Sequence, residues 1–309
     1  MMWLLLAFLS ATLLGFYDVF KKQSLKDNAV IPVLFLNTLF CSLIFLPFIG
    51  LSAMKPDWMS GSIFEVPMAG WEEHRFILLK AVIVLSSWIL GYFGMKHLPI
   101  TIVGPINATR PVMVLVGALL VFGERLNLWQ WVGVLLAIAS FFLLSRSGKR
   151  EGIDFKHNRW IGCIVLAAVL GAVSGLYDKY LMAPVDQGGL GIDRMLVQSW
   201  YNIYQLGMMG CMLLLLWWPK RHSTTPFHWH PCIPLISIFL SAADFVYFYA
   251  LSMDGSMISI VSMVRRGSVI VSFLFGAMVF REKNLKSKVV DLLLVLIGMV
   301  FLYLGSVLG

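Results

Sequence analysis

Three arginines of this 309-residue chain lie inside long apolar stretches, where a charged side chain is costly. Arg110 lies near the middle of residues 98–127, and Arg265 and Arg266 lie near the middle of residues 253–285. A charge at bilayer depth is unfavourable unless it faces a polar cavity or a partner, so such residues mark solute paths. Arg110, together with one of Arg265 and Arg266, therefore predicts a binding site for a carboxylate or another anionic group.

The spacing along the chain places Arg110 deep in the membrane. It precedes Glu124 by 14 residues, which is about 21 Å along a helix. We expect it to contact the substrate; an internal ion pair or the capping of backbone carbonyls is the alternative. Because Arg265 and Arg266 are adjacent, they must face different ways, and at most one is expected to point into the cavity.

Three aspartates are candidates for a carboxyl group that couples transport to protons. Asp18 and Asp178 lie near the ends of apolar stretches, and each has a lysine close by, Lys21 and Lys179. An interfacial salt bridge is the alternative interpretation for both. Asp244 has apolar residues for a turn on either side, so it is expected to neutralise an arginine or to accept a proton.

Neutral polar and aromatic side chains in the same stretches are candidates for the cavity wall. Residues 195–205 carry several amide and phenol groups, for which a lipid-facing helix has no use. The candidates for substrate contact, besides the arginines, are Asn37, Tyr92, Asn107, Gln198, Asn202 and Tyr247. Helix packing is an alternative role for the aromatic ones. Three histidines between residues 222 and 230 lack acidic or cysteine partners, so no metal and no cofactor is expected.

The composition identifies the elements that hold these residues. Hydrophobic residues make up 59% of the chain and charged residues 13%, and the mean hydropathy is +0.84. Soluble proteins average roughly 45–50% and 25%, so we expect a polytopic protein in a lipid bilayer. The net charge of +8 arises mostly between the apolar stretches, where basic residues act as topology signals, and no nucleic-acid partner is expected.

Ten apolar stretches of about 20 residues predict ten transmembrane helices. They cover residues 3–21, 30–50, 76–96, 100–122, 128–146, 160–182, 195–218, 232–252, 257–280 and 287–307. The longest connection, residues 51–75, is polar and rich in tryptophan, so it is expected to lie along the membrane interface.

A repeated motif divides the chain into two halves. Residues 15–18 (GFYD) recur, with one change, as residues 175–178 (GLYD). We therefore expect two five-helix repeats, residues 1–150 and 151–309. Since five is odd, the second repeat must enter the membrane from the opposite side. The expected fold class is thus an all-α integral membrane protein with an inverted repeat, the construction that supports alternating access.

These features resemble the EamA branch of the drug/metabolite transporter superfamily. The fourth helix of each half ends in a Gly-Glu-Arg-like motif, at residues 123–125 (GER) and 281–283 (REK). The resemblance implies a carrier in the inner membrane of a bacterium, often an exporter of amino acids or other metabolites. Many members have a Trp-Gly-x-Asn-like pattern in the first helix, whereas residues 14–18 read LGFYD here. Their substrates are therefore not transferred to this chain.

The sequence predicts a secondary-active transporter that exports a small polar metabolite, such as an amino acid or organic anion, as a monomer or homodimer. A lipid-modifying membrane enzyme and a nucleotide-sugar or sugar carrier of the same fold are the alternatives. The orientation stays open. Basic residues near the loops after odd-numbered helices outnumber the others, 15 against 6, which places both termini outside; the family resemblance places them in the cytosol.

Overall fold

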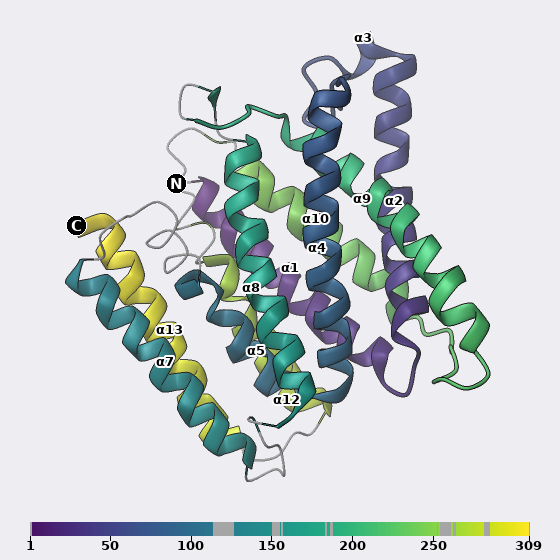
Figure 1. The fold of residues 1–309 in the computed structure, drawn as a ribbon. Helices are drawn as coiled ribbons and strands as arrows, with labels where there is room; N and C mark the ends of the chain where they lie inside the picture. Colours follow the sequence, from purple (N-terminus) through teal and green to yellow (C-terminus); the bar gives the residue numbers. More distant parts are fainter. Residues whose placement is uncertain are drawn as a thin grey trace.

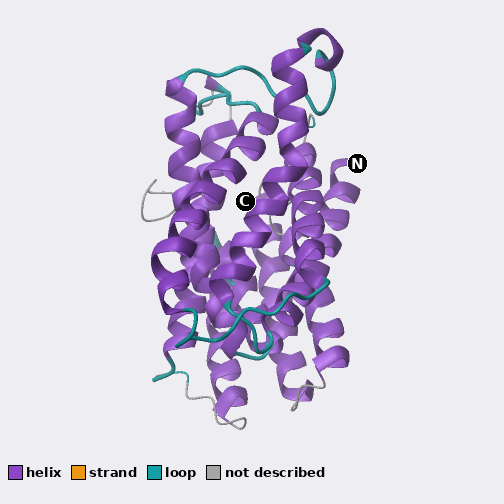
Figure 2. Cartoon of the chain, turned by 90° about the vertical axis from the view of Figure 1, so that its right-hand side faces the viewer, coloured by secondary structure: helices purple, strands orange, loops and turns teal. Residues whose placement is uncertain are grey.

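The computed structural model describes residues 2–113, 127–149, 155, 157–182, 184–185, 188–251, 253, 261, 264–280 and 285–308. All regular secondary structure in these ranges is helical (Figure 2). Among them, five helices are long and apolar enough to cross a membrane. They are α1 (Met2–Leu25), α2 (Val30–Met54), α4 (Trp71–His97), α8 (Arg159–Met182) and α10 (Cys232–Leu251).

The remaining helices are shorter or partly described. They are α3 (Pro56–Met59), α5 (Ile100–Ala108), α7 (Leu128–Lys149), α9 (Arg194–Met212), α12 (Ser268–Phe280) and α13 (Leu285–Leu308). A π-helical turn, Leu213–Trp217, and a 3₁₀ turn, Trp218–Lys220, continue α9. Each of the ten predicted stretches overlaps one of these helices.

Local chemistry fixes several helix ends. The Asp193 carboxylate accepts hydrogen bonds from the backbone N–H groups of Met195 (2.7 Å) and Leu196 (3.1 Å), so α9 begins with a side-chain cap. Glu73 accepts from the backbone N–H of Gly70 (2.9 Å) at the start of α4. Leu98, which follows α4 and precedes Pro99, has an extended backbone, because the residue before a proline disfavours the helical conformation.

Long helices pack side by side from distant parts of the chain (Figure 1). α1 lies along α10, α4 along α8, α2 along α9, and α7 along α13. The α1–α10 contact includes a hydrogen bond from Ser10 Oγ to the Ala243 carbonyl (2.7 Å), and the α4–α8 contact one from Ser87 Oγ to the Ala167 carbonyl (2.8 Å). In both contacts a buried hydroxyl finds its hydrogen-bond partner on the other helix.

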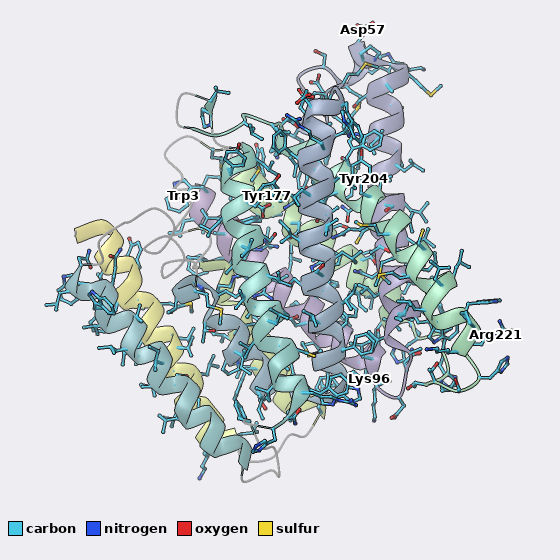
Figure 3. All side chains as sticks on the ribbon, viewed as in Figure 1. Trp3, Asp57, Lys96, Tyr177, Tyr204 and Arg221 are labelled. Carbon is cyan, nitrogen blue, oxygen red and sulfur yellow. The ribbon has the colours of Figure 1, made fainter. Side chains whose placement is uncertain are left out.

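The two ends of the bundle are defined by contacts between connections. At one end, the Asn28 side chain donates to the His228 carbonyl (2.7 Å). At the other end, Arg194 donates to the Ile63 carbonyl (3.2 Å). Figure 3 shows Asp57, on α3, at the opposite end of the molecule from Lys96, near the end of α4. Consequently α1 and α8 run in opposite directions, as do α2 and α9, and α4 and α10.

Two helices are interrupted beside the mid-membrane arginines, where the sequence predicts continuous helices over residues 100–122 and 257–280. α5 ends at Ala108, the chain turns at Thr109, and the helix resumes at Arg110. Pro111 has no N–H to donate back into the helix, which explains this break. In the second half, Gly267 forms a turn between residues 264–266 and α12. Residues 114–122 of the first stretch and residues 257–260, 262 and 263 of the second lie outside the described residues.

Candidate substrate-binding site

A cavity of about 160 Å³ lies between two apolar cores, at the centre of the helices. α1, α4, α5, α8, α9 and α10 line it, together with Arg265, Arg266, Ser268 and Val269 around the break before α12. Its charged lining residues are Asp18, Lys21, Lys80, Arg110, Asp178, Asp244, Arg265 and Arg266. Such a concentration of charge in an apolar bundle is costly unless the groups pair or bind a solute.

Two of the carboxylates pair with lysines. Lys21 Nζ donates to Asp18 Oδ1 at 2.6 Å within α1, and its ammonium lies 4.2 Å from the centre of the Tyr17 ring. Lys80, on α4, forms an ion pair with Asp178, on α8. Both members of the second pair are buried. This ion pair connects α4 to α8. The attraction between the two charges has to offset the loss of their hydration, so removing one partner would leave the other charge buried and unpaired.

The third carboxylate lies at the centre of a wider network. Asp244, on α10, forms an ion pair with Arg265 and accepts a hydrogen bond from the Tyr201 hydroxyl at 3.0 Å. The Arg265 guanidinium lies over the Tyr247 ring, 4.1 Å from its centre. The Lys80 ammonium is 5.1 Å from the centre of the Tyr201 ring. Cation–π contacts of this kind hold the basic groups in place.

Arg110 and Arg266 have no carboxylate partner among the described residues. Arg110 donates to Asn107 Oδ1 at 3.2 Å, and its Nε is buried without a hydrogen bond. The charges of Arg110 and Arg266 act on each other unfavourably. Gly171, on α8, makes room for Arg110, because a Cβ there would lie 2.6 Å from the guanidinium carbon.

The charges of the lining do not balance. Five basic groups face three carboxylates, so at full ionisation the cavity carries two uncompensated positive charges. A low-dielectric site strengthens the attraction of such charges for an anion. The arrangement is suited to binding a small solute with a negatively charged group.

Most of the candidates from the sequence meet in this cavity. Its lining includes Arg110, Asn107, Arg265, Arg266, Tyr92, Tyr247, Asp18, Asp178 and Asp244. The expectation that at most one of Arg265 and Arg266 points into it is wrong, since both line it. Their long side chains reach the same space from adjacent positions beside the turn at Gly267.

Three candidates lie elsewhere. Asn37, Gln198 and Asn202 are not among the lining residues and are buried between α2, α9 and α10. Gln198 Nε2 donates to the Ser241 carbonyl (3.2 Å), and the Asn37 side chain accepts from the Ser237 hydroxyl (3.0 Å). The Asn37 and Gln198 amides thus bond a neighbouring helix, whereas the Asn202 amide donates to the Gln198 carbonyl of its own helix (2.7 Å). A pattern of polar residues along one helix does not reveal partners on another.

Lys80 was not expected in the site. It lies inside the apolar stretch 76–96, and the criterion applied to Arg110 would have identified it. Its place one turn from the start of that stretch is where lysines commonly extend to the membrane surface. Asp178, for which an interfacial salt bridge with Lys179 was the alternative to a role in proton coupling, forms its ion pair with Lys80 in the cavity.

Comparisons with known proteins agree with the fold. Residues 1–146 match the EamA-like transporter family. An uncharacterised transporter encoded in the cobO 3' region of a Sinorhizobium species is 30% identical over 93 residues. That match covers 30% of this chain and 62% of the length of the relative. A protein of known crystal structure, 12% identical, superposes with a TM-score of 0.63 over 97% of this chain and 96% of its own.

The predicted resemblance to EamA-type drug/metabolite transporters is confirmed by the family match and by the transporter named above. The crystal structure agrees with the fold over almost the whole chain, including the half beyond the family match.

Proposed function

We propose that this protein is a secondary-active transporter of a small anionic metabolite, which it moves by alternating access across a bacterial cytoplasmic membrane. The observation that carries the proposal is the excess of positive charge in the central cavity, where Arg110 and Arg266 lack carboxylate partners among the described residues. The two arginines would bind the anionic group of the solute. The cavity volume of about 160 Å³ is below the roughly 300–1,000 Å³ of pockets for drug-sized ligands, which favours a small solute.

The packing of the helices supports two inverted five-helix repeats. The proposed repeat relates α1, α2, α4, α5 and α7 to α8, α9, α10, α12 and α13, in that order. Under this relation the α1–α10 contact corresponds to the α4–α8 contact, and α2–α10 corresponds to α4–α9; all four are present. The α2–α9, α5–α12 and α7–α13 contacts each correspond to themselves. A two-fold axis in the membrane plane produces this pattern.

The same proposal includes a place for protons. Each of Asp18, Asp178 and Asp244 holds a basic group in an ion pair. Uptake of a proton by one of them would weaken its pair and free the basic group for the solute. The family resemblance implies export as the direction of transport. The same resemblance favours a transporter over a lipid-modifying enzyme.

Flux into proteoliposomes tests the proposal. Amino acids, carboxylates, sugars and organic cations are offered under an imposed pH gradient to the wild type and to Arg110→Gln and Arg266→Gln. We expect flux of anionic solutes only, with the apparent affinity of each variant reduced roughly 10- to 150-fold, as for loss of a hydrogen bond to a charged group.

Arg75→Gln is the matched control, because Arg75 is exposed and pairs with Glu72 outside the cavity. Flux confined to cations or neutral sugars, or equal flux by all four proteins, would contradict the proposal.

A further inference from the structure

A groove of about 540 Å³ lies along the start of α8 and shares no lining residue with the central cavity. Asn158 and Arg159, where α8 begins, belong to its polar end. Its apolar side along the helix includes Ile161, Val165, Leu166 and Val169. Spacings of three and four residues place most of these on one face of α8. The groove therefore has a polar head and an apolar body, as a phospholipid has.

The length of the groove matches one leaflet of a bilayer. Val169 follows Arg159 by ten residues, which is about 15 Å along a helix. The hydrocarbon core of a bilayer is about 30 Å thick, so each leaflet contributes roughly half of that length. A Cβ on Gly162 would have no neighbouring atom within 4 Å, and Leu166 and Val169 are 50% and 40% exposed. An acyl chain can therefore lie along this part of α8.

Arg159 is placed at the head of the groove by aromatic contacts. Its guanidinium carbon lies 4.5 Å from the centre of the Trp160 ring, and that ring stacks on His97 with 3.8 Å between the ring centres. Cation–π contacts hold a basic group in place without using its N–H donors. Arg159 is exposed and forms no ion pair within the described part of the chain. Its charge is therefore open to a ligand.

The surroundings of Arg159 are basic as well. Lys22, Lys96 and Arg159 all act as positive charges on the neighbouring His97. The Lys96 ammonium donates to the Thr225 hydroxyl at 2.9 Å, and this acceptor carries no charge. Clusters of basic groups at the surface of a membrane attract anionic headgroups. The head of the groove thus favours a lipid with a net negative charge.

We propose that the groove binds one anionic phospholipid, with its phosphate group at Arg159 and one acyl chain along α8 as far as Val169. The planar guanidinium fork matches the geometry of a phosphate group. A zwitterionic lipid such as phosphatidylcholine carries a positive group beside its phosphate, which the basic surroundings of Arg159 would repel. The inference rests on the groove and its charges, and it goes beyond the proposed transport of an anion.

Native mass spectrometry tests the proposal. The full chain, purified in detergent, is titrated with phosphatidylglycerol and, separately, with phosphatidylcholine of the same acyl chains. We expect one phosphatidylglycerol to bind roughly 10-fold more tightly than phosphatidylcholine, and Arg159→Gln to abolish this preference, as for loss of a hydrogen bond to a charged group. Gly162→Trp fills the body of the groove and should weaken the binding of both lipids.

Arg221→Gln is the matched control. Arg221 also lies over a tryptophan ring, 4.4 Å from the centre of Trp218, but it does not line the groove, so both affinities should stay unchanged. Equal binding of the two lipids by the wild type, or an unchanged preference in Arg159→Gln, would overturn the proposal. Displacement of the bound lipid by soluble glycerol phosphate at the concentration at which phosphatidylglycerol displaces it would also overturn it, in favour of a phosphate site without a role for the apolar body. The readout does not involve flux, so none of these results bears on the transport of anions.

Discussion

At the scale of single residues, each carboxylate of the cavity forms an ion pair with one particular basic group. Asp18 holds Lys21 on its own helix, whereas Asp178 holds Lys80 from another helix. The first pair is local and could be predicted from the spacing in the sequence. The second needs α4 and α8 to lie side by side, and it leaves Arg110 without a carboxylate partner among the described residues.

Breaking the Lys80–Asp178 pair should destabilise the protein strongly. Lys80→Met leaves the Asp178 carboxylate buried without its cation, or forces it to take up a proton, at a cost of about 3–5 kcal/mol. The double variant Lys80→Met/Asp178→Asn should recover most of that loss, because no buried charge is left unpaired. Unfolding in detergent, followed by denaturant titration, measures both.

The exposed pair of Arg75 and Glu72 provides the comparison. Arg75→Met should cost about 0–1 kcal/mol, the usual contribution of a solvated ion pair. If Lys80→Met cost no more than this, the pair on α4 and α8 would not be a structural link.

At the scale of elements, glycines set how closely helices approach, but not all for the same reason. A Cβ on Gly15 would lie 2.5 Å from the Val271 side chain, so this glycine allows α1 to pack on α12. Gly175, in the corresponding motif, has no atom of another element within 4 Å and lines the cavity. The same sequence pattern therefore serves packing in one half and open space in the other.

Gly94, on α4, offers a sharp test of helix packing. A Cβ there would lie 2.3 Å from Ile164 Cγ1 on α8, so Gly94→Ala should cost about 1–3 kcal/mol through overpacking. Gly94→Ala/Ile164→Ala exchanges volume across the contact and should restore part of the stability. Gly50→Ala, with no neighbouring atom within 4 Å, is the control and should be neutral or slightly stabilising. Thermal unfolding of the four proteins in one detergent gives the ranking, and equal effects at Gly94 and Gly50 would contradict the described approach of α4 to α8.

At the scale of the whole molecule, the proposed inverted repeat requires corresponding connections to lie on opposite sides of the membrane. The connection after α1 contains Lys26, and the connection after α8 contains Val185; both residues are exposed. They lie at opposite ends of the bundle, since the first end includes Asn28 and the second adjoins the start of α9 (Figure 1).

Labelling from one side of the membrane tests this arrangement. Lys26→Cys and Val185→Cys, each in a chain whose native cysteines are replaced, are treated in intact cells with a thiol reagent that does not cross membranes. We expect one position to react and the other to react only after the cells are opened. The identity of the reactive position gives the orientation, for which basic loops and family resemblance predict opposite answers. Reaction of both positions in intact cells would exclude the inverted repeat.

The sequence by itself determined the class of structure and the deepest functional candidates. Apolar stretches of bilayer length leave no other fold class, and charges inside them, such as Arg110, Arg265 and Asp244, must find a polar environment because lipid offers none. These inferences depend on single residues and their immediate neighbours, which is why they could be made without a structure.

Only the tertiary structure decided which polar groups share a space. It placed Lys80 opposite Asp178, put both Arg265 and Arg266 in the cavity, and kept Gln198 and Asn202 apart from it among other helices. Each of these outcomes depends on the rotation of one helix against another. That rotation is set by packing over the whole bundle, including close contacts such as that of Gly94 with Ile164, and no local pattern of residues contains it.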